Sequence, residues 1–137
     1  MKFVVHHHTS RPGEDDHYDL MIDEGDTLAT WRVSLEGMAR LIGGDTAGAT
    51  KIADHRREYL SYEGPVSCDR GMVKIMDSGE CEAAEFSDTV RRYLMKGKEL
   101  RGMMVISFLH GDRWEIQFTS SDLHTERQPQ RRRGTEG

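Results

Sequence analysis

Residues 17–34 read HYDLMIDEGDTLATWRVS, and this stretch decides the fold. Apolar and polar residues alternate on both sides of Glu24-Gly25-Asp26, a sequence that favours a tight turn. The alternation predicts two antiparallel strands, at residues 17–23 and 27–34, joined as a hairpin. Two further turn sequences of this kind occur later in the chain, so we expect the hairpin to be part of a sheet.

The first of these strands has two chemically different faces. Side chains alternate along a strand, so His17 and Asp19 point to the same side, where their nitrogen and oxygen atoms can converge on one metal ion. The other side is apolar and is expected to face a core; it carries Tyr18, Leu20 and Ile22. The strand therefore presents polar groups on a rigid scaffold.

Short alternating runs separated by turns recur about every ten residues, which is typical of an antiparallel barrel or sandwich. Asp77-Ser78-Gly79 and His110-Gly111-Asp112 both predict hairpins. We expect strands near residues 2–8, 17–23, 27–34, 49–54, 71–76, 79–84, 90–96, 101–109 and 113–119. One short helix closed by glycine is expected within residues 35–48, and a second around residues 86–90, where Ser87-Asp88 resembles a helix start.

The composition fits one soluble domain of 137 residues, with 36% hydrophobic and 31% charged residues. No apolar run could cross a bilayer and the N-terminus lacks a secretory signal, so we expect a cytoplasmic protein with no membrane partner. Cys68 and Cys81 are isolated and build neither a disulfide framework nor a zinc ribbon. The net charge of -5 argues against a nucleic-acid coat protein, so we expect nucleic-acid contacts to be local or helped by a bound cation.

The chain divides into two parts. Residues 1–119 are expected to form the barrel domain, and residues 120–137 a polar, basic and disordered tail. The tail contains Pro129 and the run Arg131-Arg132-Arg133, and it cannot bury enough apolar surface to offset its ordering entropy. The arginine run is a candidate for nonspecific attraction to DNA.

Histidine and aspartate side chains near the N-terminus suit a catalytic metal. On the first strand His6 and His8 share a face and the histidine between them takes the other, so at most two of the three serve one site. Spacing leaves two ligand trios open: His8, His17 and Asp19, or His17, Asp19 and His55, the latter the arrangement of non-haem iron oxygenases. Either trio leaves coordination positions for water or substrate, and mixed nitrogen and oxygen ligation suits Mn, Fe, Zn or Co.

A series of short motifs runs through the chain in a fixed order. They are Phe3-Val4-Val5-His6-His7-His8, His17-Tyr18-Asp19-Leu20, Thr30-Trp31-Arg32-Val33, Ala53-Asp54-His55-Arg56-Arg57-Glu58-Tyr59, Glu63-Gly64, Gly71-Met72-Val73-Lys74-Ile75-Met76-Asp77-Ser78-Gly79, Lys96-Gly97-Lys98-Glu99-Leu100-Arg101-Gly102 and Trp114-Glu115-Ile116. In this order they resemble the motifs of the 3′-phosphoesterase domain of bacterial DNA ligase D, such as FVVxxH, HYDFRLE, WAVPKG and EDHPxxY. The resemblance covers roughly residues 3–118, and we expect a stand-alone, divergent homologue.

The resemblance implies a mainly β fold, a closed or nearly closed antiparallel β-barrel of about eight strands with one or two short flanking helices. Members of the family remove 3′-terminal ribonucleosides and 3′-phosphates from DNA ends with manganese. It thus implies a hydrolase of DNA repair by non-homologous end joining. By the same resemblance the metal ligands are His8, His17 and Asp19, and the groups that contact the scissile phosphate are His55 and Tyr59.

The resemblance also implies a cofactor and partners. The expected ion is Mn(II), with Zn(II), Co(II) or Fe(II) as alternatives. The expected partners are DNA or DNA/RNA 3′ ends, with separate ligase, polymerase or end-binding proteins beside them.

The resemblance fails at three positions where the family has basic residues that grip phosphate: Met21, Leu35 and Ala47. Under one hypothesis other side chains take over this role and the protein remains a metal-dependent phosphoesterase. The candidates are His6, Arg11, Lys51, Arg56 and Arg57. Under a second hypothesis the protein binds metal and nucleic acid in end joining with weak or no catalysis, and a third hypothesis is the oxygenase, with His55 as a ligand.

Overall fold

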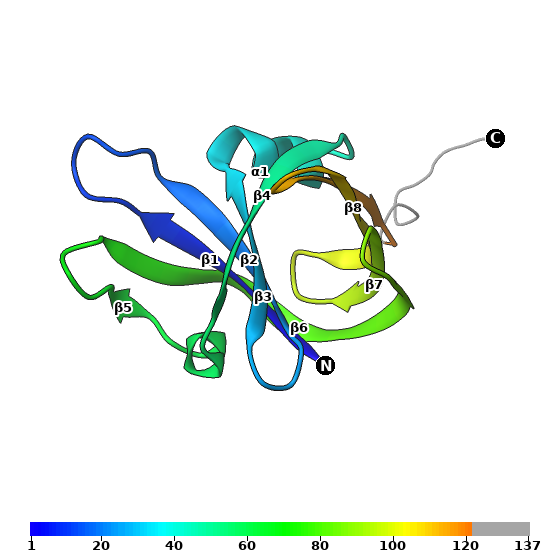
Figure 1. Ribbon diagram of the computed structural model, residues 1–137, viewed down its shortest axis with the longest axis horizontal. Helices are drawn as coiled ribbons and strands as arrows, with labels where there is room; N and C mark the ends of the chain where they lie inside the picture. Colours follow the sequence, from blue (N-terminus) through cyan, green and yellow to red (C-terminus); the bar gives the residue numbers. More distant parts are fainter. Residues whose placement is uncertain (122–137) are drawn as a thin grey trace.

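The chain forms a closed antiparallel β-barrel (Figure 1). The computed structural model describes residues 1–121. Its strands are β1 Lys2–Thr9, β2 His17–Asp23, β3 Leu28–Ser34, β4 Ala47–His55, β5 Gly64–Pro65, β6 Met72–Phe86, β7 Val90–Lys96, β8 Arg101–His110 and β9 Arg113–Ser120. Eight strands follow the order β1-β2-β3-β4-β9-β8-β7-β6, and pairing of β1 with β6 closes the ring. The short β5 adds to β6 outside the ring. The barrel predicted from the sequence is confirmed.

The inner face of the barrel holds the main core. Alternate residues of each strand face inward, so Leu20 and Ile22 of β2 lie in this core with Tyr18 packed against it, as the alternation predicted. Trp31 and Trp114 meet edge to face at 5.7 Å between ring centroids, which joins β3 to β9. Inward packing of one face leaves the other face of the same strands for different contacts.

A smaller apolar cluster lies on the outer face of the sheet. It consists of the buried side chains Val4, Met21 and Leu28, with Tyr59, Leu60 and Ile75 packed against them. Tyr59 and Leu60 belong to a 3-10 turn, η1, spanning Arg57–Leu60. This cluster fixes η1 against the outside of the barrel, next to the polar end of β1 and β2.

The single α-helix of residues 1–121 is α1, Leu35–Ile42, which packs on β4, β3 and β9. The Ser34 hydroxyl accepts a hydrogen bond from the Gly37 N–H and caps the helix, while Met38 and Leu41 enter the core. Gly43 follows its last turn, as predicted. The second predicted helix, around residues 86–90, was wrong: Ser87 accepts the Val90 N–H with its hydroxyl and forms the turn between β6 and β7 instead.

The predicted hairpin at Asp77-Ser78-Gly79 was also wrong, because β6 runs through it as one strand. The buried Asp77 carboxylate accepts backbone N–H groups of Lys98 and Leu100, in the connection between β7 and β8. The pairing of β6 with β1 shifts register here. A Cβ on Gly79 would lie 2.4 Å from the Lys96 carbonyl oxygen, so this glycine permits close backbone approach rather than a turn.

Two further expectations concern the C-terminal tail and the absence of a membrane span. The tail predicted at residues 120–137 begins at the last residue of β9, and its part from Asp122 on, including the arginine run, lies outside the described residues. Within residues 1–121, no helix is long and apolar enough to cross a membrane.

Candidate metal centre

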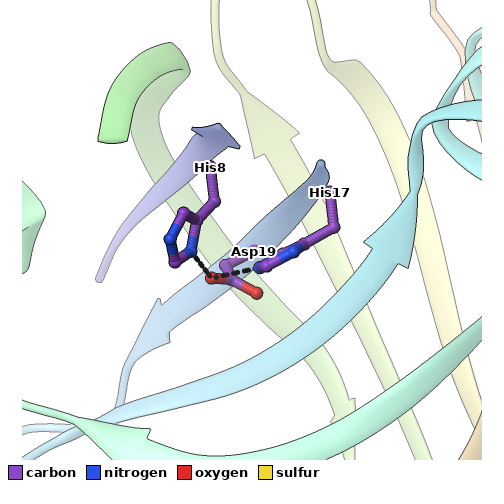
Figure 2. Close-up of side chains that lie close together, drawn as sticks. All are labelled: His8, His17 and Asp19. Atoms are coloured by element: carbon purple, nitrogen blue, oxygen red, sulfur yellow. Dashed lines mark hydrogen bonds and ion pairs between the residues drawn. The ribbon is translucent and has the colours of Figure 1, made fainter. Parts of the chain in front are cut away.

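Three polar side chains converge on the outer face of the β1–β2 hairpin (Figure 2). The register pairs His8 with His17, and His6 with Asp19, so all four side chains point to the same side of the two strands. One ligand atom from each of His8, His17 and Asp19 lies within 4.8 Å of the others. Strand pairing therefore gathers the trio that the family resemblance implied.

Asp19 lies at the centre of this group. Its Oδ2 atom is 3.3 Å from Nε2 of His17 and 3.8 Å from Nδ1 of His8. Its Oδ1 atom is buried without a hydrogen-bond partner, and the nearest cation is Arg32, whose Nε lies 3.6 Å away. The Asp19 carboxylate and the rings of His8 and His17 thus direct one oxygen and two nitrogen atoms toward a common point.

The electrostatics keep Asp19 ionised. Burial by itself raises the pKa of this carboxyl, but the hydrogen bond with His17, the pairing with His8 and the charge of Arg32 outweigh it and hold the pKa well below its usual range. The pairing with Asp19 likewise raises the pKa of His8, against the effect of its partial burial. The protein therefore maintains a negative charge in a mostly buried position.

The backbone fixes the ring of His8. Its Nε2 lies 2.7 Å from the carbonyl oxygen of Arg70, and a carbonyl only accepts, so this nitrogen is the one that donates. Nδ1 is then left toward Asp19 as the ligand atom. A carbonyl in this position orients a metal-binding histidine and increases its basicity.

The residues fit a divalent ion. Two imidazole nitrogens and one carboxylate oxygen are ligands that Mn, Fe, Zn and Co accept, and three protein ligands leave open positions. The unpartnered Oδ1 of Asp19 would gain a partner from such an ion. The group therefore qualifies as a metal site, while its donors leave the identity of the ion open.

A cavity of about 220 Å³ borders the trio and contains the two other residues that the family implies. His55, at the end of β4, donates from Nδ1 to the Ala53 carbonyl, at 3.1 Å, so its Nε2 is the ring atom left for other contacts. The Tyr59 ring meets His55 edge to face at 5.6 Å between centroids. His6 also lines the cavity, and its buried Nε2 has no hydrogen-bond partner. Burial lowers the pKa of His6, which favours its neutral form.

The structure brings the other predicted residues to different places. Lys51 lies on the inner side, its Nζ 5.5 Å from the centroid of the Trp31 ring. Arg57 pairs with Asp23, with Nη2 2.7 Å from Oδ2. Arg56 lies 5.9 Å from the centroid of the Tyr59 ring, outside the cavity lining. Arg11 pairs with Glu14 in the β1–β2 loop and lines a larger hollow together with His8 and His17.

The alternative ligand trio with His55 is not gathered within the distance that the trio with His8 meets, as far as residues 1–121 are concerned. Met21 and Ala47, two of the positions without the family's basic residue, are buried among apolar side chains, and Leu35 is exposed at the start of α1. No cation enters the site from these three positions.

Three arginines near the trio were missed by the sequence analysis. Arg32, Arg70 and Arg113 line a second hollow of about 580 Å³, which starts at His8 and His17. Arg32 follows Trp31 on β3, and alternation from an inward-facing tryptophan could have placed its side chain on the outer face, where it pairs with Asp19. Arg70 and Arg113 gave no signal, because they reach the hollow through a loop and through a strand far along the chain.

The comparisons with known proteins agree with this geometry. A search of curated proteins found no match. Residues 5–120 match the family described as the DNA ligase D 3′-phosphoesterase domain, over nearly the whole barrel. A match of this extent indicates 3′-phosphoesterase-type processing of DNA ends in general, and confirms the resemblance that the motifs carried. The chain therefore belongs to the DNA ligase D 3′-phosphoesterase domain family.

Proposed function

We propose that the protein is a divalent-metal-dependent phosphoesterase that removes 3′-phosphates and 3′-terminal ribonucleosides from DNA ends, with Mn(II) as its ion. The observation that carries this proposal is the convergence of His8 Nδ1 and His17 Nε2 on the Asp19 carboxylate. A bound divalent ion supplies Lewis acidity to a phosphoryl oxygen and acidifies an attacking water.

The chain's own residues would position the substrate. His8, His17 and Asp19 hold the ion, and the Arg70 carbonyl keeps the His8 ring in place. In the adjacent cavity His55 and Tyr59 contact the scissile phosphate through Nε2 and the phenolic hydroxyl. The Tyr59 hydroxyl donates a hydrogen bond to the negative charge that develops in the transition state, and His55 does so as an imidazolium, because its Nδ1 proton is held by the Ala53 carbonyl. The His6 Nε2, buried and unpartnered, lines the same cavity beside these two groups.

A second function, metal and DNA binding without efficient catalysis, is favoured by one observation. The positions at which the family has a phosphate-gripping residue hold Met21, Leu35 and Ala47, and none of these side chains can donate a hydrogen bond to an anion. If no other group replaces them, charge-assisted donors worth roughly 1.5–3 kcal/mol each are lost from the site.

The test separates binding from turnover. Purified protein is incubated with Mn(II) and a primer carrying a 3′-phosphate or a 3′-ribonucleotide, and the products are resolved on a denaturing gel. The variant H17A removes a ligand, and H110A, which changes an exposed histidine at the last position of β8, is its matched control. Mn(II) binding is measured on the same samples by calorimetry.

We expect turnover by the wild type and by H110A, and a loss of at least 100-fold in H17A together with its Mn(II) affinity. Stoichiometric Mn(II) binding by the wild type without turnover would instead support the binding module. Iron- and O₂-dependent activity that survives H8A would support the oxygenase, in which His55 replaces His8 as a ligand.

A further inference from the structure

A row of polar side chains crosses the outer face of five neighbouring strands. Cross-strand pairing of β1, β2, β3, β4 and β9 gives its order as His6, Asp19, Arg32, Thr50 and Arg113. The first two members belong to the metal centre and its cavity. The last three have no part in the reaction proposed above, although they extend the same row.

Arg113 lies across β4 with its charge available. Its Nη1 donates to the Thr50 hydroxyl at 3.0 Å. Its guanidinium lies over Gly48, where a Cβ would be 3.5 Å from Nη2. Within the described part of the chain no carboxylate forms an ion pair with Arg113. Because Thr50 accepts this bond with its oxygen, its own O–H remains able to donate to another acceptor.

Arg32 links Arg113 to the metal centre. Its side chain is 47% exposed, and its Nε lies 3.6 Å from Oδ1 of Asp19. A guanidinium has five N–H donors in one plane, so most of its donors are left for a second anion. Arg32 also lines both the 220 Å³ cavity and the 580 Å³ hollow, so it stands where the two meet.

The charges around the larger hollow differ between its two sides. The sheet side contributes Arg32 and Arg113, and the β1–β2 loop contributes Glu14, Asp15 and Asp16 against one cation, Arg11, which pairs with Glu14. A polyanion is repelled by the acidic loop and attracted to the arginines. Its favourable position is therefore over β3, β4 and β9.

We propose that Arg32, Thr50 and Arg113 form a phosphate track, which binds the backbone phosphates of the DNA strand whose 3′ end reaches the metal centre. From β3 to β9 the track spans two strand spacings, roughly 10 Å at about 4.8 Å each. Successive phosphates of a B-form strand rise about 3.4 Å along the axis, so the track has room for two or three phosphates. This inference rests on the proposed function, and it places new cations where the family's own are absent.

The test measures DNA binding without metal, so that it does not depend on catalysis. A fluorescently labelled single-stranded oligonucleotide is titrated in EDTA at several salt concentrations. R113Q is compared with R92Q, which removes one positive charge from β7, where Arg92 pairs with Glu85. R113K keeps the charge at the track. Unfolding midpoints and Mn(II) affinities of all variants check that the fold and the metal centre are retained.

We expect R113Q to weaken binding at low salt by at least about threefold and to reduce the slope of log K against log salt by about 0.7, the value for one phosphate contact on a single strand. R92Q should change neither quantity, and R113K should retain most of the slope. Equal binding by R113Q and R92Q would overturn the track, whether or not the wild type turns over. A specific loss in R113Q with an inactive wild type would support the track and refute the proposed phosphoesterase.

Discussion

The inner and outer faces of β1–β3 are built from alternate residues of the same strands, but they bury different kinds of side chain. The inner face is filled by apolar side chains such as Leu20, Ile22 and Trp31, which are fully buried. The outer face buries His6 and Asp19, each with a polar atom that lacks a hydrogen-bond partner, and on the inner face Nε1 of Trp31 also lacks one. The difference between the faces is charge, because the ionised Asp19 carboxylate costs free energy in a buried position unless it is paired or binds a ligand. One strand thus supplies stability on one side and chemistry on the other.

The largest expected effect is on the free energy of unfolding. It distinguishes two neighbouring residues, Trp31 on the inner face and Arg32 on the outer face, when each is replaced by alanine. Trp31→Ala leaves a cavity between β3 and β9 and should lower the free energy of unfolding by about 3–5 kcal/mol. Arg32→Ala should change it by less than about 1 kcal/mol, because the side chain is half exposed. Urea unfolding monitored by circular dichroism measures both, and similar losses would contradict the division between the faces.

The next effect is on the outer face alone. Asp19→Asn removes a charged ligand and should weaken Mn(II) binding by at least about 100-fold, or 2.8 kcal/mol at 1.4 kcal/mol per tenfold. The chain should stay folded in EDTA, since asparagine keeps the shape and an acceptor oxygen. Asp112→Asn, in the exposed β8–β9 turn, is the control for the loss of one charge. Undiminished Mn(II) affinity in D19N would remove Asp19 from the metal centre.

A smaller effect concerns pH and the attachment of η1 to the outer face. The Arg57 guanidinium, bonded to Asp23, lowers the pKa of that carboxyl. A lowered pKa stabilises the fold above the unfolded value, near 3.9, and the contribution disappears as the pH falls through the folded value. The stability difference between wild type and R57Q should be constant above pH 5 and should shrink below pH 4. A stability difference that increases as the pH falls below 4 would contradict a lowered pKa for Asp23.

The smallest effect is a difference in reactivity between the two thiols, and it involves no change in stability. Cys81 lies in the inner core, and burial raises its pKa to about 11, whereas Cys68 is exposed. The thiolate is the reactive form, so an alkylating reagent at pH 8 should modify Cys68 and spare Cys81 in the folded protein. Mass spectrometry should show one label in native buffer and two in urea. Two labels in native buffer would show that the core around Cys81 opens.

Local patterns were sufficient for most of the fold. Alternation around Glu24-Gly25-Asp26 predicted the β2–β3 hairpin and the faces of its strands, because side-chain direction depends on neighbouring residues only. Asp77-Ser78-Gly79 has the composition of a turn but lies inside a strand. The Asp77 carboxylate accepts hydrogen bonds from backbone N–H groups some twenty residues away, and this contact cannot be predicted from the neighbouring residues.

The candidate site divides in the same way. His17 and Asp19 are two residues apart on one strand, and their shared face follows from the sequence alone. The choice between His8 and His55 as third ligand depends on which strand pairs with β2, which the motifs indicated only through the family. Arg113 joins Arg32 only through the register of β4 with both β3 and β9, so the spacing of residues could not reveal it.

The hydrogen bond between His8 and the Arg70 carbonyl has a thermodynamic consequence. Cys68 and Asp69 of this loop adopt positive φ angles, which cost energy in residues other than glycine, so the loop conformation needs support from its contacts. The same arginine side chain lines both hollows. An oligonucleotide that reorganises this loop must alter the affinity for Mn(II), and Mn(II) must then alter oligonucleotide affinity by the same factor. Titrations of either ligand with the other present and absent measure this factor, and a factor of one in both directions would show that the loop does not couple them.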